Sequence, residues 1–260
     1  MKNRNSGSKE DKTTKTGKFK IFLIAAMVVL AGVAIYIVLI QEFKPSNIYT
    51  PEKVIGDFKL VSDSVLLNNE KVVVLFVGAE ACPYCVAESW SVVEALQYYG
   101  SFSGLVHILS NSSEAIPNVP GYGFANSSLD SSKVSLWEVE TTTSSWNQRL
   151  QLLNSTEQSL FKLYDPSGNI PFLLIGGLYV HIGSEVPPGP TANMNWTEAQ
   201  KQTSSLSQIG VDVSREASNI TTTINYVISH LSLFKGFGGS AVLLQNYSFC
   251  LQVNDEISSK

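Results

Sequence analysis

Hydrophobic residues follow two kinds of pattern along the chain, and the first is an uninterrupted run at residues 21–40. This run holds no charged side chain, and about 20 residues of helix suffice to cross roughly 30 Å of hydrocarbon. A cleaved secretory signal would have a shorter apolar region of about 7 to 15 residues, followed by small residues. Here the polar residues Gln41 and Glu42 follow, so the pattern favours a single membrane-spanning helix.

Beyond a polar linker at residues 41–51, the pattern changes to short apolar segments typical of an α/β domain. Residues 71–77 are a continuous run of strand-forming residues, as found where helices cover both faces of a sheet. In residues 83–99 apolar side chains recur at helical spacing, and this helix is expected to stop before Gly100. Residues 105–109 form another short apolar strand. The order strand, helix, strand predicts a parallel βαβ unit.

The rest of the domain is expected to continue in the same α/β manner. In chain order we expect a loop at 111–132, a strand at 133–139, a helix at about 145–163, a turn at 164–169, a hairpin of residues 170–175 and 178–182, and a helix at about 209–234. The hairpin turns at Gly176-Gly177, which suits a tight antiparallel connection. The last helix is amphipathic and is expected to end at Gly236.

Charge is distributed unevenly and gives the chain an orientation. Residues 1–20 carry a net charge of +5, whereas the chain beyond residue 41 has 11 basic and 20 acidic residues. The positive-inside rule then predicts a cytoplasmic N-terminus and an acidic extracytoplasmic domain, in a protein of the cell membrane. Only 15% of all residues are charged and 10% are aromatic. This composition argues against a disordered protein and against nucleic acid as the partner.

The exterior assignment has a second, weaker indication in the pattern N-x-[ST], which accepts N-linked sugars. Chance would give about three such sites in a chain so rich in Ser and Thr, and a merely Ser-rich surface remains an alternative to a glycoprotein. The candidate acceptors all lie beyond the apolar run, at Asn111, Asn126, Asn154, Asn195, Asn219 and Asn246.

The candidate chemistry lies where the strand at 71–77 leads into its helix, at Cys82-Pro83-Tyr84-Cys85. At the start of a helix, free backbone N–H groups and the helix dipole favour a thiolate on the first cysteine, while the second lies one turn inward. Pro83 suits the first helical position because its missing N–H has no helical partner there. We expect Cys82 to take part in exchange through a mixed disulfide and Cys85 to resolve it, the two forming a disulfide when oxidised.

Other residues are weaker candidates for redox or metal chemistry. Cys250 lies in an apolar setting and is expected to be a buried thiol rather than a third redox partner. His107, His181 and His230 are expected to be structural, and no second pair with metal-ligand spacing accompanies the cysteines. No metal site and no cofactor is therefore expected. Two alternatives stay open: a surface binding or structural protein with a stabilising disulfide, and a protein that holds a metal with its thiols.

The segment 72–85 (VVVLFVGAEACPYC), its helix and the late hairpin at 169–183 (NIPFLLIGGLYVHIG) resemble the thioredoxin superfamily. The resemblance implies a mixed sheet flanked by helices, with Ile170-Pro171 at the family's cis-proline. It places Pro171 beside the cysteines and gives the Ile170 backbone, with Pro83 and Tyr84, a part in binding substrate. Residues 110–165 would be an insertion, as in disulfide oxidoreductases of the DsbA type.

The expected organisation, in full, is a basic tail at 1–20, a membrane helix at 21–40, a linker at 41–51, a thioredoxin-like domain at 52–235 and an extension at 236–260. The chain as a whole resembles an uncharacterised archaeal family of thioredoxin-like membrane proteins, known as domain of unknown function 929. That name implies no activity.

The chain also departs from the thioredoxin pattern. Many thioredoxins have Trp before the first cysteine and a buried acid six positions before it, where this chain has Ala81 and Phe76. The resemblance then leaves Glu80 as the substitute proton acceptor. The expected function is a membrane-anchored oxidoreductase that exchanges disulfides with exported proteins, with a membrane redox partner. An exterior setting tends to be oxidising, which favours an oxidase or isomerase over a reductase.

Overall fold

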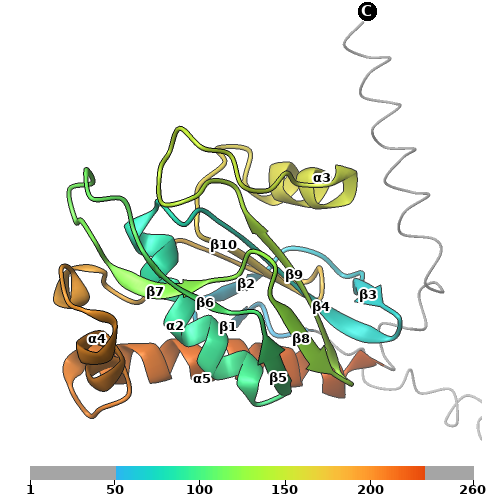
Figure 1. Ribbon diagram of the computed structural model, residues 1–260. Helices are drawn as coiled ribbons and strands as arrows, with labels where there is room; N and C mark the ends of the chain where they lie inside the picture. The colour runs from blue at the N-terminus through green and yellow to red at the C-terminus, as the bar shows by residue number, and fades with distance from the viewer. Residues whose placement is uncertain (1–50, 232–260) are drawn as a thin grey trace, which may run out of the picture. The chain divides into compact units, whose positions relative to one another are not determined.

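The computed structural model describes residues 51–231 of the 260-residue chain (Figure 1). The expected basic tail, the membrane helix at 21–40, Asn246, Cys250 and the C-terminal extension lie outside the described residues. Within residues 51–231, no helix is long and apolar enough to cross a membrane.

A mixed seven-stranded sheet forms the centre of the domain, in the order β1-β2-β11-β10-β4-β3 with β9 along β4. Its strands are β1 (Val54–Ile55), β2 (Phe58–Leu60), β3 (Leu67–Asn68), β4 (Lys71–Gly78), β9 (Val134–Glu140), β10 (Phe172–Ile175) and β11 (Tyr179–Ile182). Strand β9 runs parallel to β4, with Val72 opposite Val134, and β10 runs antiparallel to β4, with Val77 opposite Phe172. The α/β class and the mixed sheet flanked by helices are confirmed.

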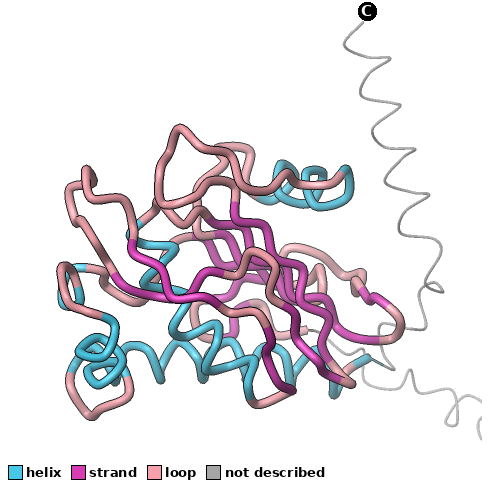
Figure 2. Tube along the Cα trace, in the orientation of Figure 1, coloured by secondary structure: helices cyan, strands magenta, loops and turns pink. Residues whose placement is uncertain are grey.

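Helices cover both faces of this sheet (Figures 1 and 2). They are α2 (Pro83–Gln97), α3 (Ser155–Tyr164), α4 (Trp196–Thr203) and α5 (Gln208–Ser229), with a short 3-10 turn η1 (Gly189–Thr191) before α4. Helices α2 and α5 pack against each other on one face, whereas α3 packs Leu160 onto Leu75 and Phe172 of the other. The β4 side chains are buried on both faces because both are covered, which is why this strand reads as an unbroken apolar run.

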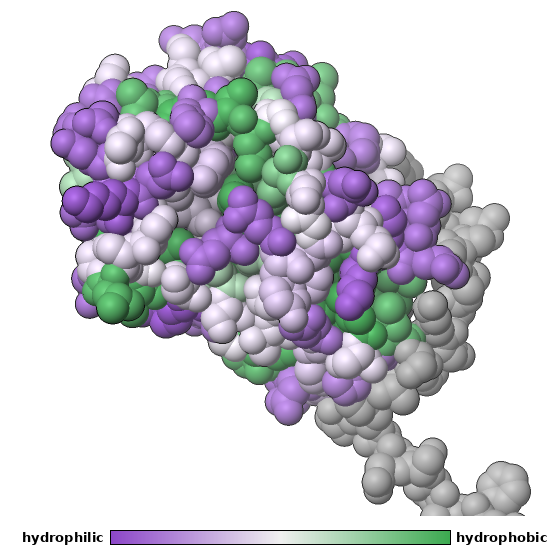
Figure 3. Space-filling model, turned by 60° about the horizontal axis from the view of Figure 1, so that its bottom comes forward, coloured by the Kyte–Doolittle hydropathy of each residue, from purple (hydrophilic) through white to green (hydrophobic). Residues whose placement is uncertain are grey.

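Two small hairpin-like sheets lie beside α2: β5 (Gly100–Ser103) pairs with β8 (Ser128–Ser131), and β6 (Val106–Leu109) pairs with β7 (Pro120–Gly123). Strand β7 packs directly on α2, where Trp90 Nε1 donates to Pro120 O at 2.9 Å and Tyr122 N donates to Ser89 Oγ at 2.8 Å. On the face that comes forward in Figure 3, hydrophobic residues form patches among hydrophilic ones.

Several expected elements need correction. The strand at 105–109 exists as β6 but stays out of the main sheet, so the parallel partner of β4 is β9 instead. The supposed loop at 111–132 contains β7 and β8, and the supposed insertion at 110–165 supplies β9 to the main sheet. Which strands pair in a sheet depends on residues far apart in the sequence, and the local pattern of a strand does not indicate its partner.

Two helices also differ in extent. Helix α3 starts at residue 155 rather than about 145, because Asn154 and Glu157 form a capping box that starts the helix there. Upstream of it, Ser145 N donates to Thr143 Oγ1 and Gln148 N donates to Ser145 O, a turn that competes with helix. Helix α5 ends at Ser229, earlier than expected, with His230 as its C-cap.

Candidate active site around the two cysteines

The junction between β4 and α2 presents Cys82 at the N-cap of the helix. Ala79 and Ala81 are fully buried after the strand, and Cys82 N donates to Ala79 O at 3.0 Å. The backbone of Cys82 is extended (φ −77°, ψ 117°), and Pro83 takes the first helical position as expected. Cys82 Sγ therefore faces the unpaired N–H groups at the start of α2.

Cys82 and Cys85 lie together as free thiols. Cys85 N donates to Cys82 Sγ at 3.3 Å, and only 6% of Cys82 and 2% of Cys85 is exposed. The hydrogen bond from the Cys85 thiol, with backbone N–H groups of Cys85 and Tyr84, lowers the pKa of Cys82 despite burial. Burial, followed by donation to Cys82, raises the pKa of Cys85 well above its ordinary value. The first thiol is thus the better nucleophile at neutral pH, and the second keeps its proton.

A buried carboxyl group that sequence reasoning missed lies beside this pair. Glu140 ends β9, opposite Gly78 in β4, and is only 2% exposed. Burial, together with the charges of Glu80 and Glu138, raises its pKa to about 8. Its charge in turn contributes to the raised pKa of Cys85, and its Oε2 has no hydrogen-bond partner within the described residues. The carboxyl ends of parallel strands meet at the same edge of a sheet. The position of Glu140 directly after the expected strand at 133–139 was therefore the signal in the sequence that could have placed it beside the cysteines.

Glu80, the expected proton acceptor, lies closer to solvent. Its backbone N–H donates to Thr142 O at 3.1 Å, and its carboxylate lies against Gly123. Burial raises its pKa, opposed by a backbone hydrogen bond from Ser144. Glu80 and Glu140 interact through their charges, and Glu80 is the more exposed of the two acids.

The peptide bond between Ile170 and Pro171 is cis, as the resemblance to the thioredoxin superfamily implied. Strand β10 begins at Phe172 opposite Val77, so the same register places Pro171 level with Gly78, at the end of the sheet where Cys82 lies. Pro171 is buried and its carbonyl accepts from Gly183 N at 2.8 Å, while Ile170 is half-buried.

Exposed aromatic side chains and two loops border the cysteines. Tyr84 is 49% exposed and Trp146 is 45% exposed. Trp146 Nε1 donates to Glu114, whose charge opposes the lowered pKa of Cys82. Asn111 N donates to Ala81 O at 3.0 Å, which ties the loop after β6 to the residue before Cys82. The rim of the site is therefore partly aromatic and acidic.

The candidate sugar acceptors differ in how their amides are used. Asn111 Nδ2 donates to Ser144 O at 2.8 Å beside the cysteines, and Asn219 Nδ2 donates to Asp57 and Glu216. Asn154 and Asn195 are exposed and serve as N-caps through Oδ1. Asn126 is exposed in a turn with φ +67°. Because a sugar would be attached to Nδ2, the acceptors at 126, 154 and 195 are the more accessible ones.

The three histidines lie away from the cysteines. His107 stacks on Trp196 with ring centroids 3.5 Å apart, His181 is buried with Nδ1 3.4 Å from Asp57 O, and His230 contacts Tyr226. Residues 51–231 contain no group of three or more side chains that could hold a metal ion.

A comparison with models of protein families finds a match for part of the chain. Residues 57–139 match the family model described as Domain of unknown function (DUF929). This stretch runs from just before β2 almost to the end of β9 and holds both cysteines, so it supports the resemblance to that family. No curated protein and no solved structure matches the chain.

Proposed function

We propose that the chain is a thiol–disulfide oxidoreductase of thioredoxin-like fold. The single observation that carries this proposal is the asymmetry of its cysteine pair. Cys82 sits at a helix N-cap with a lowered pKa, and Cys85 is buried one turn inward with a raised pKa. A stabilising disulfide would need no such difference between its two sulfurs, whereas exchange chemistry needs one attacking and one resolving thiol.

In the reducing direction, the Cys82 thiolate attacks one sulfur of a substrate disulfide. The substrate S–S bond breaks, its second sulfur leaves as a thiolate, and a mixed disulfide forms on Cys82. Cys85 then loses its proton and attacks Cys82 Sγ, which releases the first substrate sulfur and forms the Cys82–Cys85 disulfide. Two electrons have passed to the substrate. The same steps in reverse oxidise a substrate dithiol.

Glu140 is the group that we assign to take the proton of Cys85. It is buried, its pKa is about 8, and its charge interacts with both cysteines. A base with a pKa near the working pH is suited to proton transfer in either direction. Glu80 would then connect Glu140 to solvent, a different part from the one expected for it.

The cis bond before Pro171 and its place at the cysteine end of the sheet support the thioredoxin-like interpretation. With it we propose that Ile170, Pro171, Pro83 and Tyr84 contact an extended substrate segment. We further propose that residues 21–40 anchor the domain outside the cell membrane, where exported proteins would be its substrates. The apolar run and the basic tail in front of it support that placement.

The test is turnover of a model disulfide substrate by the full chain and by two single variants. Cys82→Ser should abolish turnover because it removes the attacking sulfur. Cys85→Ser should accumulate a mixed disulfide on Cys82, detectable as a mass increase that dithiothreitol reverses. Unchanged turnover in Cys82→Ser would overturn the assignment.

The reduction potential of the pair separates the remaining alternatives. A value of about −120 to −180 mV would indicate an oxidant or isomerase, and one near about −270 mV a reductant. A potential below about −300 mV is typical of structural disulfides and would favour a binding or structural protein instead.

A further inference from the structure

Within residues 51–231, the middle of strand β9 has no partner strand on the side away from β4. In this part of the chain β9 pairs only with β4, in a parallel ladder bounded by Val72 N donating to Lys133 O and Thr141 N donating to Gly78 O, both at 2.9 Å. In a parallel ladder, alternate residues of a strand bond to the same neighbour. The odd-numbered residues of β9 therefore bond to β4, and the N–H and C=O groups of the even-numbered ones turn to the other side.

The two ends of that free edge are closed by local contacts. Val134 N donates to Ser131 Oγ at 3.2 Å, and Glu140 O accepts from Gln151 N at 2.9 Å. Between them, Leu136 and Glu138 face a groove rather than a strand. The preceding strand β8 is no substitute, because its ladder is with β5.

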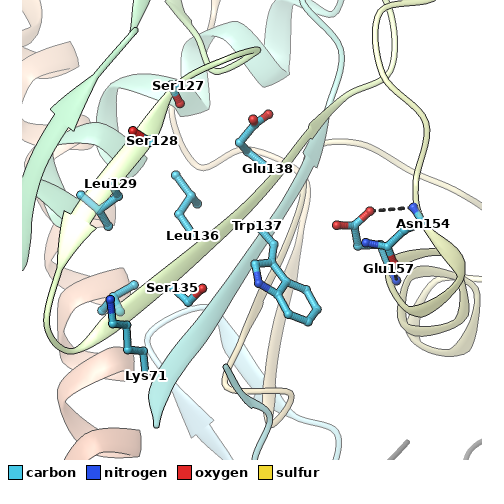
Figure 4. Close-up of a pocket in the computed structure, with 11 residues that line it drawn as sticks. Lys71, Ser127, Ser128, Leu129, Ser135, Leu136, Trp137, Glu138, Asn154 and Glu157 are labelled. Carbon is cyan, nitrogen blue, oxygen red and sulfur yellow. Dashed lines mark hydrogen bonds between the residues drawn. The ribbon is translucent and has the colours of Figure 1, made fainter. Parts of the chain in front are cut away.

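This groove has a volume of about 400 Å³, within the range of binding pockets. Figure 4 shows Ser127, Ser128 and Leu129 along one wall, and Asn154 and Glu157 of the α3 cap beyond the other side of β9. Leu136 and Glu138 project on the side of the β8 wall. The groove thus lies along the edge of β9 and is lined from both β8 and the start of α3.

Two buried polar atoms in the groove have no hydrogen-bond partner within the described residues. They are Ser127 Oγ and Glu138 Oε2. The other oxygen of Glu138 accepts from Gln151 Nε2 at 3.3 Å. Buried polar atoms without a partner are uncommon and cost free energy, which a ligand with a suitably placed donor would recover.

We propose that the groove between β8 and β9 binds an extended segment of a partner polypeptide, which adds to β9 as a strand and places a basic side chain against Glu138. Leu136 and Glu138 each turn an N–H and a C=O group to the free side of β9. The main chain of an extended peptide carries donors and acceptors at the same spacing and can pair with these groups. The charged residues on the lining are Lys71, Glu138 and Glu157, and Glu157 already accepts from Asn154 N. The free Oε2 of Glu138 is therefore the group that favours a basic side chain over an acidic one. The site is separate from Cys82 and does not depend on the proposed redox function.

The test adds the pentapeptide Thr-Lys-Val-Lys-Thr, with both ends capped so that they carry no charge, to the full chain. Binding is measured as slower hydrogen exchange of the amides of β9. The peptide should slow exchange of the Leu136 and Glu138 amides at least about tenfold, because each gains a carbonyl partner. The Ser135 and Trp137 amides, already bonded to β4, should change little. Alkylating Cys82 beforehand should leave the protection intact, and its loss would place the peptide at the cysteines and overturn the proposal.

Two control experiments test whether the peptide binds by adding a strand. The same peptide with every backbone amide N-methylated has no backbone donor on either edge and should not protect Leu136 or Glu138, and this control needs no altered chain. Thr-Glu-Val-Glu-Thr should bind more weakly than the Lys peptide, and Glu138→Gln should remove that preference. Absence of protection at millimolar Lys peptide, or equal protection by the N-methylated one, would refute strand addition at this groove.

Discussion

Glu140 is a buried acid beside the cysteines that comes from β9 rather than from β4. The position six residues before Cys82 is Phe76, which packs on Phe124 with ring centroids 5.1 Å apart. Gly78 leaves room beside Glu140, since a Cβ there would lie 3.3 Å from Glu140 Oε2. The acid thus reaches the cysteines from β9, across a strand position that carries no side chain.

Replacing Glu140 by Gln should slow the resolving step rather than the first attack. Cys85 holds its proton firmly, so without a nearby base its attack on the mixed disulfide should slow by about 10- to 100-fold at pH 7. Stopped reactions resolved by mass spectrometry would show the mixed disulfide persisting. The deficit should shrink at higher pH, where hydroxide removes the proton. Glu94→Gln, at an exposed position of α2, is the matched control, and equal resolution rates in Glu140→Gln and wild type would contradict the role.

The pKa of Cys82 should depend on its partner thiol. Since the hydrogen bond from Cys85 is the largest cause of the lowered pKa of Cys82, Cys85→Ala should move that pKa upward. The pH profile of Cys82 alkylation by iodoacetamide measures it: the midpoint should lie below 9.0 in wild type and higher in the variant. A midpoint that is the same in both proteins would show that the helix N-terminus alone sets it.

At the scale of elements, local signals were predictable and long-range pairing was not. The β4–α2 junction and the Gly176-Gly177 hairpin follow from adjacent residues, whereas the cis bond before Pro171 was implied only by the resemblance to the thioredoxin superfamily. The sequence predicts β6 as the parallel partner of β4, but the partner is β9. Adjacent residues do not distinguish the two, because both are short apolar segments. Glu140 was missed for the same reason: its place beside Cys85 depends on which strand lies next to β4.

The packing of β7 on α2 gives a prediction for the element that sequence reasoning treated as a loop. A Cβ at Gly121 would lie 2.3 Å from Val86 O, a backbone atom that cannot turn away. Gly121→Ala should therefore force the two elements apart and lower the free energy of unfolding by about 1 to 3 kcal/mol. Urea unfolding measures this. Gly189→Ala, where no atom lies within 4 Å, is the control, and equal effects in the two variants would refute the close contact.

At the scale of the whole molecule, burial raises the pKa of several carboxyl groups to about 7 to 8. The geometry at Glu88 fits a protonated carboxyl, because Ser184 Oγ lies 2.8 Å from both Glu88 Oε2 and Val186 O. One hydroxyl proton serves one acceptor, so a protonated Glu88 that donates to Ser184 satisfies both contacts. Burial, followed by the charge of Glu216 on α5, raises the pKa of Glu88 to about 8. Glu216 itself is buried, with a pKa raised to about 7.

These shifts fix the sign of the pH dependence of stability. Between the unfolded pKa of 4.5 and the folded values near 7 to 8, the native state binds more protons than the unfolded chain. The free energy of unfolding should therefore fall as pH rises from about 5 to 9, as Glu88, Glu140 and Glu216 lose protons in the fold. Urea midpoints across this range measure it. Glu88→Gln, which can still donate to Ser184 but does not ionise, should flatten the slope, and a midpoint that rises with pH, or a parallel slope in the variant, would contradict the buried neutral acid.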